Sequence, residues 1–105
     1  MVVLGIDPGL AHTGWGVVET RGATCRARAY GCVTTRASEP IDLRLGRIYS
    51  ELRGVIDRYG PTELAIESVY FGENTKSAIA TAQARGAAIV ACSTAGLKVG
   101  EYTPM

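Results

Sequence analysis

The chain opens on an apolar run that stops at a carboxylate. Residues 2–7 read VVLGID and are apolar on both faces, as expected for a strand in the middle of a sheet. Residues 14–20 (GWGVVET) and 23–35 (ATCRARAYGCVTT) read as two further strands. The connections between these segments are short, and short connections favour an antiparallel meander. The first third of the chain therefore predicts three antiparallel strands.

The hydrophobic period changes after Pro40. The apolar side chains now recur at helical spacing and form one stripe, made of Leu45, Ile48, Tyr49, Leu52, Val55, Ile56 and Tyr59. Pro40 near the start and Gly60-Pro61 at the end are typical limits of a helix. Residues 63–67 (ELAIE) then predict a short strand, which again ends in a carboxylate. Because the helix lies between the strand 23–35 and the strand 63–67, we expect a right-handed crossover and parallel pairing.

Residues 75–95 predict a second helix that is rich in small residues. Two sets of them are spaced four apart: Ala80, Ala84 and Ala88, and Ala82, Gly86 and Val90. A glycine inside a helix costs about 1 kcal/mol relative to alanine, so we expect a close neighbour at Gly86. With few charges, this helix is expected to pack against both the sheet and another helix. Residues 97–103 (LKVGEYT) predict a fifth strand.

Composition narrows the class of protein. A chain of 105 residues fits one domain, and 47% hydrophobic with 20% charged residues is typical of a globular protein. No apolar run approaches the roughly 20 residues that span a bilayer, and no secretory signal is visible. The chain has an odd number of cysteines and no C-x-x-C motif; the cysteines are Cys25, Cys32 and Cys92. In one regular strand, Cys25 and Cys32 would face opposite sides. We therefore expect no disulfide framework, no zinc site and a reducing cytoplasm.

The arginines are unevenly distributed. The net charge of the chain is only +1. The segment between Glu19 and Glu39 nevertheless contains no acidic residue and four arginines, namely Arg21, Arg26, Arg28 and Arg36. Arg26 and Arg28 share a face if this segment is a strand. Two interpretations stay open, namely a solvated edge that discourages aggregation and a patch that contacts phosphate.

The candidate chemistry lies in two carboxylates. Asp7 and Glu67 end the first and fourth predicted strands, and parallel neighbours place such residues at the edge where open α/β sheets bind ligands. Neighbouring strands lie about 4.8 Å apart, so the two acids repel unless one is protonated or a hard cation such as Mg²⁺ lies between them. A metal site is the favoured interpretation, and it suits phosphodiester hydrolysis. Acids that only cap helices or loops are the alternative.

Three stretches carry a resemblance to a known family. LGIDPGLAHTGWGVVE, LAIESVYFGENTKSA and TAQARGAA, in that order, resemble the RuvC-type Holliday-junction resolvases of the ribonuclease-H-like superfamily over essentially the whole chain. The resemblance implies an α/β fold, with a mixed sheet of three antiparallel strands followed by parallel strands and with helices packed on it. It also implies that Asp7 and Glu67 are catalytic Mg²⁺ ligands of a DNA endonuclease of recombination and repair. The complete enzyme would hold two ions, with Mn²⁺ as an alternative.

The resemblance implies DNA contacts as well. Tyr70 or Phe71 matches an aromatic position that contacts a base near the junction centre, and stacking on an aromatic ring tolerates any sequence; a core-capping role is the alternative. Asn74, Lys76 and Arg85 fall in the matching segment. Lys76, at the start of a helix, suits a phosphate contact, whereas Arg85 could equally face solvent or a partner subunit.

The family resemblance further implies a two-fold homodimer and branch-migration helicases as partners. The small-residue helix 75–95 is the best candidate for the dimer interface, since isologous pairing suits it. Packing within one chain is the competing explanation.

The chain departs from the family near its end. Resolvases of this type continue to a helix with a D-x-x-D pair, whereas the only acid after Glu73 is Glu101. We therefore expect a single nuclease domain, residues 1–105, that is truncated at its C-terminus, exposes one sheet face and cuts DNA weakly or not at all. Two alternatives are a non-catalytic DNA-binding or dimerisation remnant and an actin-like ATPase fragment in which DPGLAHTG would cradle phosphates.

Overall fold

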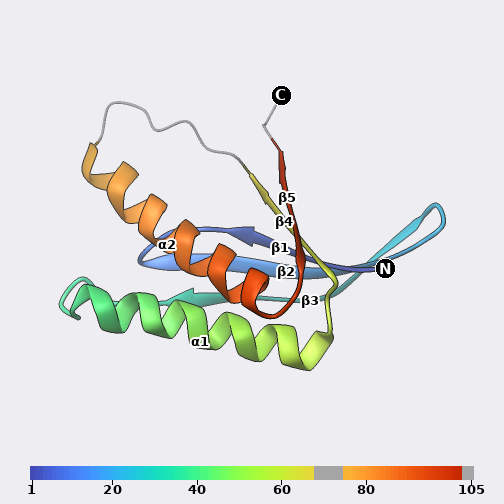
Figure 1. The fold of residues 1–105 in the computed structure, drawn as a ribbon, viewed down its shortest axis with the longest axis horizontal. Coiled ribbons are helices and arrows are strands. Elements are labelled where there is room, and N and C mark those ends of the chain that lie inside the picture. Colours follow the sequence, from blue (N-terminus) through green and yellow to red (C-terminus); the bar gives the residue numbers. More distant parts are fainter. Residues whose placement is uncertain (68–74, 103–105) are drawn as a thin grey trace.

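The protein folds into one mixed sheet with two helices. The computed structural model describes residues 1–67 and 75–102. Its elements are β1 (Val2–Asp7), β2 (His12–Arg21), β3 (Thr24–Thr34), α1 (Ile41–Tyr59), β4 (Glu63–Glu67), α2 (Thr75–Thr94) and β5 (Lys98–Tyr102). The strand order is β3-β2-β1-β4-β5 (Figure 1). β1, β2 and β3 form the predicted antiparallel meander, and β4 and β5 extend it in parallel. The predicted α/β fold class is confirmed.

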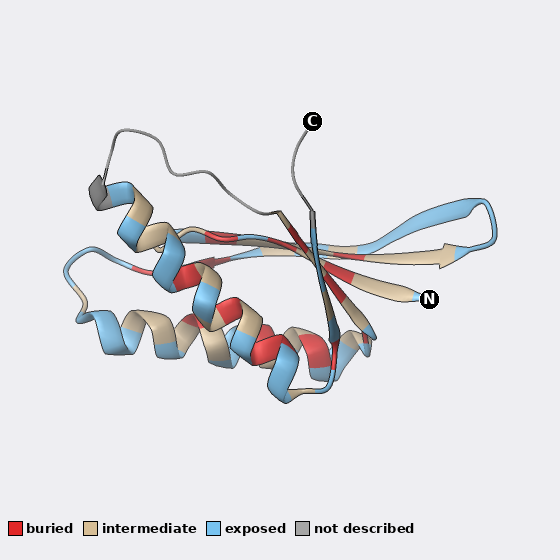
Figure 2. Ribbon diagram, turned by 45° about the horizontal axis from the view of Figure 1, so that its top comes forward, coloured by how far each residue is buried: buried red, intermediate tan, exposed pale blue. Residues whose placement is uncertain are grey.

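The core lies between one face of the sheet and the two helices. Leu4 and Ile6 of β1 and Leu64 and Ile66 of β4 are buried on that face, and α1 packs against α2 across it (Figure 1). Figure 2 shows the buried residues of both helices turned toward this layer. Because side chains alternate along a strand, the residues between these apolar positions project from the other face. The described part of the chain places no helix on that face.

Helix α1 follows its predicted stripe closely. It starts after Pro40 and ends at Gly60, which adopts a left-handed conformation (φ 62°) and donates its backbone N–H to the carbonyl of Ile56 at 2.9 Å. Glycine suits this position because it pays no steric penalty at positive φ. Ile48, Leu52 and Ile56 point into the core.

Helix α2 has one buried and one exposed set of small residues. Ala84 and Ala88 are fully buried, together with Ala91 and Cys92, so the predicted packing against the sheet and the other helix is confirmed. In contrast, Ala82, Gly86 and Val90 are exposed. A Cβ added to Gly86 would meet no atom within 4 Å, so the expected close neighbour at Gly86 is wrong within this chain. In the described residues, neither helix is long and apolar enough to cross a membrane.

A bulge in β3 changes the side on which its residues lie. Val17 pairs with Ala29 and Val18 with Ala27, so Arg28 is an extra residue on β3. Two residues of one strand then oppose one of the other, which breaks the alternation. Cys25 and Cys32 consequently pair with the even-numbered Thr20 and Gly14 of β2 and share a face. The prediction that they face opposite sides is wrong for this reason.

The arginines around the bulge are partly neutralised. Arg28 contacts the Glu19 carboxylate at 2.6 Å and Arg21 contacts it at 3.4 Å. Arg26 lies opposite Glu19 in the register, on the same side as Arg28. These pairs agree with the solvated-edge interpretation of the arginines, while phosphate contact stays a prediction.

Candidate metal and nucleic-acid site

Asp7 and Glu67 lie at the same edge and on the same face of the sheet. The last parallel pair between β1 and β4 is Ile6 with Ile66, and the two acids are the next residues on their strands. Since Ile6 and Ile66 face the core, the acids project from the face that carries no helix. Asp7 is exposed and Glu67 half-buried. The predicted placement of Asp7 and Glu67 at one edge of the sheet is confirmed, while their role as metal ligands stays a prediction.

Small residues leave space beside Asp7. A shallow hollow of about 340 Å³ surrounds it, lined also by Gly5, Gly14, Gly16 and Ala65. Gly14 lies directly opposite Asp7 in the β1–β2 register, and a Cβ added there would already lie 3.9 Å from the Cβ of Asp7. A larger side chain at this position would fill the space that a bound ion and its waters need.

The loop after Asp7 is held by a buried threonine. The Thr13 hydroxyl, which has no solvent exposure, donates to the carbonyl of Gly9 at 2.6 Å and accepts the Gly9 backbone N–H at 3.4 Å. Gly9 has no room for a side chain, because its Cβ would lie 2.5 Å from the carbonyl oxygen of His12. The turn therefore closes tightly and fixes the chain directly after Asp7.

A second threonine holds the same loop from β3. The Thr35 hydroxyl donates to the carbonyl of Leu10 at 2.5 Å, and the Thr35 backbone N–H donates to that of Ala11 at 3.0 Å. Arg44 of α1 in turn donates to the Thr35 hydroxyl at 2.9 Å. Buried polar groups cost free energy unless they are hydrogen-bonded, so this chain of bonds ties the Asp7 loop to α1. Sequence reasoning missed both threonines, since nothing local marks them.

The donor set suits a hard divalent cation. Within residues 1–67 and 75–102, no group of three or more His, Cys, Asp or Glu side chains is placed to hold a metal. Two carboxylates nevertheless fit Mg²⁺, which commonly binds one or two protein carboxylates and takes its other oxygens from water and substrate phosphates. Asp7 and Glu67 are the residues that would hold it.

The predicted DNA-contacting residues are only partly described. Tyr70, Phe71 and Asn74 lie outside the described residues, and the backbone of Lys76 belongs to the first turn of α2. Arg85 forms an ion pair with Glu101 of β5 at 3.0 Å, and its buried Nε has no hydrogen-bond partner among the described residues. Since Glu101 pairs in register with the core residue Ile66, Arg85 lies on the helix-covered side. The structure does not bring it to Asp7 and Glu67.

An arginine–carboxylate cluster at the same edge was also missed. Arg47 of α1 contacts both carboxylate oxygens of Glu39, at 2.8 and 2.5 Å, and the Arg36 backbone N–H donates to it at 2.8 Å. The hydrogen bonds from Arg47 contribute most, followed by the Arg36 backbone N–H, and they lower the pKa of Glu39 from 4.5 to about 2. The cluster borders a hollow of about 580 Å³. It lies near the Asp7 loop because His12 pairs with Thr34.

Comparisons with known proteins give a consistent result. The family model described as crossover junction endodeoxyribonuclease RuvC matches residues 3–105. Curated proteins of that name from Moorella thermoacetica and Desulforamulus reducens are 45% and 42% identical over 105 residues, which is all of this chain and 63% and 64% of theirs. The solved structure of T. thermophilus RuvC in complex with Holliday junction substrate has a TM-score of 0.93 at 39% identity, over 100% of this chain and 67% of that one. The chain thus spans less than two thirds of these curated relatives.

Proposed function

The chain belongs to the RuvC family of crossover junction endodeoxyribonucleases, and from this premise we propose that it carries the metal-holding edge of a nuclease that cuts four-way DNA junctions. Because the chain spans less than two thirds of its curated relatives, the activity, the DNA substrate and the partners are all part of the proposal. The observation that carries it is the placement of Asp7 and Glu67 on adjacent parallel strands, on the open face of the sheet.

The two acids have complementary parts in this proposal. Bound Mg²⁺ would activate water and stabilise the leaving oxygen of a phosphodiester. Glu67 is half-buried and Asp7 is exposed, so Asp7 would be the more accessible of the two carboxylates to a bound DNA. The Thr13 and Thr35 hydroxyls hold the backbone of Gly9 and Leu10, so the loop that follows Asp7 is formed without a bound ion.

DNA binding is proposed along the same edge. Tyr70, Phe71, Asn74 and Lys76 come soon after Glu67 in the sequence, and we expect them to contact a junction whose scissile phosphate lies at the metal. Arg85 is paired with Glu101, so in this proposal it connects α2 to β5 and does not contact the DNA.

A homodimer is proposed through α2. Its outward face carries Ile79 and Val90, which are 57% and 50% exposed, and between them the small, exposed Ala82 and Gly86. Small residues let two helices approach closely, and a two-fold axis would bring the same stripe of two copies together. Branch-migration helicases as further partners rest on family membership alone.

The test is an Asp7→Asn variant, with Asp57→Asn, an exposed acid near the end of α1, as matched control. We expect the parent chain to bind a synthetic four-way junction more tightly than linear duplex, and Asp7→Asn to retain that binding while losing any Mg²⁺-dependent cleavage. Thermal unfolding gives a readout independent of activity. A Mg²⁺ concentration ten times its Kd stabilises the folded state by about 1.4 kcal/mol, and Asp7→Asn should lose this gain.

Three results would count against the proposal. Equal stabilisation of all three proteins by Mg²⁺ would remove the metal site from Asp7. Junction binding without any metal effect would favour the non-catalytic remnant. Stabilisation by ATP instead of Mg²⁺ alone would favour the nucleotide hydrolase.

A further inference from the structure

Strand β3 is a free edge of the sheet. It is the outermost strand on its side, and among the described residues no backbone bond from outside the sheet reaches residues 25–33. Such an edge presents a row of unpaired N–H and C=O groups. Beyond the bulge at Arg28, the segment from Ala29 to Thr34 pairs regularly with β2. This segment has the geometry that another extended chain could join.

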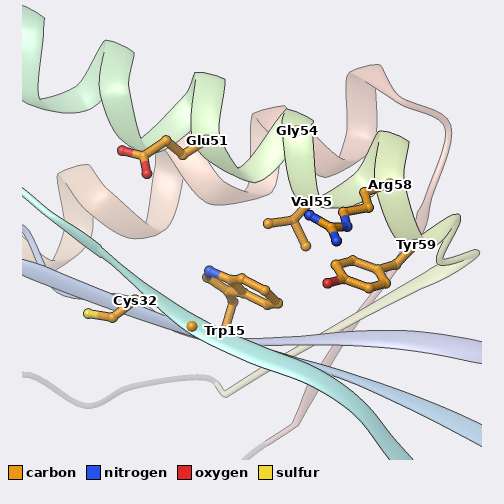
Figure 3. Close-up of a pocket in the computed structure, with 8 residues that line it drawn as sticks. Trp15, Cys32, Glu51, Gly54, Val55, Arg58 and Tyr59 are labelled. Carbon is orange, nitrogen blue, oxygen red and sulfur yellow. The ribbon is translucent and has the colours of Figure 1, made fainter.

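An aromatic hollow lies beside that segment. It measures about 540 Å³ between β3 and α1, and its apolar side chains are Trp15, Val55 and Tyr59 (Figure 3). The rings of Trp15 and Tyr59 are tilted by 42° with centroids 6.2 Å apart, within the range of favourable aromatic pairs. All three side chains are only half-buried, so they offer apolar surface to a further side chain.

Two glycines keep the hollow open. A Cβ on Gly31 would lie 2.5 Å from Cζ2 of Trp15, so only glycine lets the indole lie across β3 at this point (Figure 3). On the opposite wall, a Cβ on Gly54 would meet no atom within 4 Å. The space beside α1 at Gly54 is therefore unfilled, while the indole of Trp15 forms the opposite wall.

The charges around the hollow differ between its ends. α1 runs back along β3 toward the β2–β3 hairpin (Figure 1), which places Arg58 at the hairpin end, with its guanidinium 5.5 Å from the centre of the Tyr59 ring. Arg26 of β3 lies toward the same end. The ion pairs within the described residues include neither Arg26 nor Arg58. Glu51 lies two helical turns before Arg58, at the other end of the hollow.

We propose that this edge binds an extended, acidic segment of another protein as a sixth strand beside β3. Its backbone would pair with Ala29–Thr34, a large apolar side chain would enter the hollow over Trp15 and Tyr59, and an acidic side chain would face Arg58. In such strand addition, main-chain bonds supply affinity and a pocket for alternate side chains supplies specificity. Trp15 also borders the hollow around Asp7, but the remaining contacts of this site come from β3 and α1, and the proposal does not depend on the proposed nuclease function.

Trp15 is the only tryptophan, so its fluorescence reports on the hollow directly. The probe is a capped seven-residue peptide that alternates Thr and Val around a central Phe and carries Asp near one end. We expect a saturable change in Trp15 emission, with NMR shifts of the amides of residues 29–34. A peptide with Ser in place of Phe, and one with Pro beside it, should each bind at least tenfold more weakly.

Two glycines of α1 provide matched variants. Gly54→Gln fills the hollow and should weaken peptide binding at least tenfold. Gly46→Gln lies in the same helix, also with no atom within 4 Å of its Cβ position, but outside the hollow, and should bind as the parent does. Both replace a helix-interior glycine by a better helix former, so both should fold. Arg58→Glu should reverse the preference from the Asp peptide to one that carries Lys.

Four results would overturn the proposal. The first is that Trp15 emission does not respond to the peptide at millimolar concentration, and the second is that Gly54→Gln and Gly46→Gln weaken peptide binding equally. The third is a change in Trp15 emission that grows with protein concentration without any peptide. The fourth is the same change in Trp15 emission produced by a DNA junction and abolished by Gly54→Gln. The third would mean that a second copy occupies the edge, and the fourth that DNA does.

Discussion

The turn after Asp7 allows a sharp test of the site's architecture, because one methyl group should disturb it. In Gly9→Ala, the new Cβ would lie 2.5 Å from the carbonyl oxygen of His12, about 0.9 Å short of the 3.4 Å at which ordinary contact begins. The opposing atom belongs to the backbone, and Thr13 and Thr35 hold the loop from both sides. Neither partner can turn away as a flexible side chain would, so the loop itself has to shift.

The expected loss follows from three contributions. Forcing an extra carbon into a packed site costs about 1–3 kcal/mol, and weakening the Thr13–Gly9 hydrogen bond costs about 1 kcal/mol. Alanine returns about 0.4–1 kcal/mol by restricting the unfolded chain. The net loss in the free energy of unfolding is therefore about 1–4 kcal/mol. Each kcal/mol lowers the Tm by about 4–8 °C in a domain of this size.

Urea unfolding followed by circular dichroism measures this loss, with Gly46→Ala as the matched control. A Cβ at Gly46 meets no atom within 4 Å, so the same substitution in α1 should stabilise the protein by about 1 kcal/mol through helix propensity. A loss of stability in Gly9→Ala and a gain in Gly46→Ala would separate the effect of steric crowding from the general effect of replacing glycine by alanine. If Gly9→Ala is as stable as the parent, the turn is looser than its contacts indicate and Asp7 is not held by it.

Two further outcomes follow from the titrating groups. The lowered pKa of Glu39, about 2 against 4.5 unfolded, means that its contribution to stability is complete above pH 4.5 and is lost as the pH falls toward 2. Glu39→Gln should flatten urea stability between pH 2 and 5 relative to the parent, and an unchanged profile would contradict the Arg47 pair. Burial raises the pKa of Cys92 from 9.0 to about 11. A thiol reagent at pH 8 should therefore modify only Cys25 and Cys32 quickly, and fast reaction of all three would place Cys92 outside the core.

Helix α1 was predictable because its apolar side chains recur at helical spacing, whereas β1 and α2 were recognised from composition and from the residues that bound them. The strand 63–67 and the start of α2 at residue 75 match the structure, and the stripe through Ile48, Leu52 and Ile56 defines the buried side of α1. The second strand begins two residues earlier than expected, at His12. Its pairing with Thr34 extends the strand, and pairing with a distant segment is not encoded in the local sequence.

What escaped prediction depends on contacts across strands and between elements. The bulge at Arg28 is a matter of register, which is set by the partner strand and not by local composition. The Glu39–Arg47 pair and the threonine hydrogen bonds of the Asp7 loop connect parts of the chain that are distant in sequence. The spacing of residues along the sequence therefore cannot predict them. By contrast, the shared edge of Asp7 and Glu67 was predictable. The antiparallel meander makes β3 run parallel to β1, and the crossover through α1 makes β4 run parallel to β3, so β1 and β4 end at the same edge of the sheet.

The register also produces a feature that bears on how the metal site is completed. Gly16, Gly5, Ala65 and Gly100 pair in turn across β2, β1, β4 and β5, so on these four strands one row of the open face carries nothing larger than a methyl group. The row ends at Tyr30 of β3, which pairs with Gly16. The row lies two residues from Asp7 and Glu67 along their strands. Within the described residues, no third His, Cys, Asp or Glu side chain is grouped with the two carboxylates. Further ligands of the proposed cation would therefore come from the open side, as water, a DNA phosphate or a protein segment laid over the small-residue row, where the small side chains would let any of them approach the sheet backbone closely.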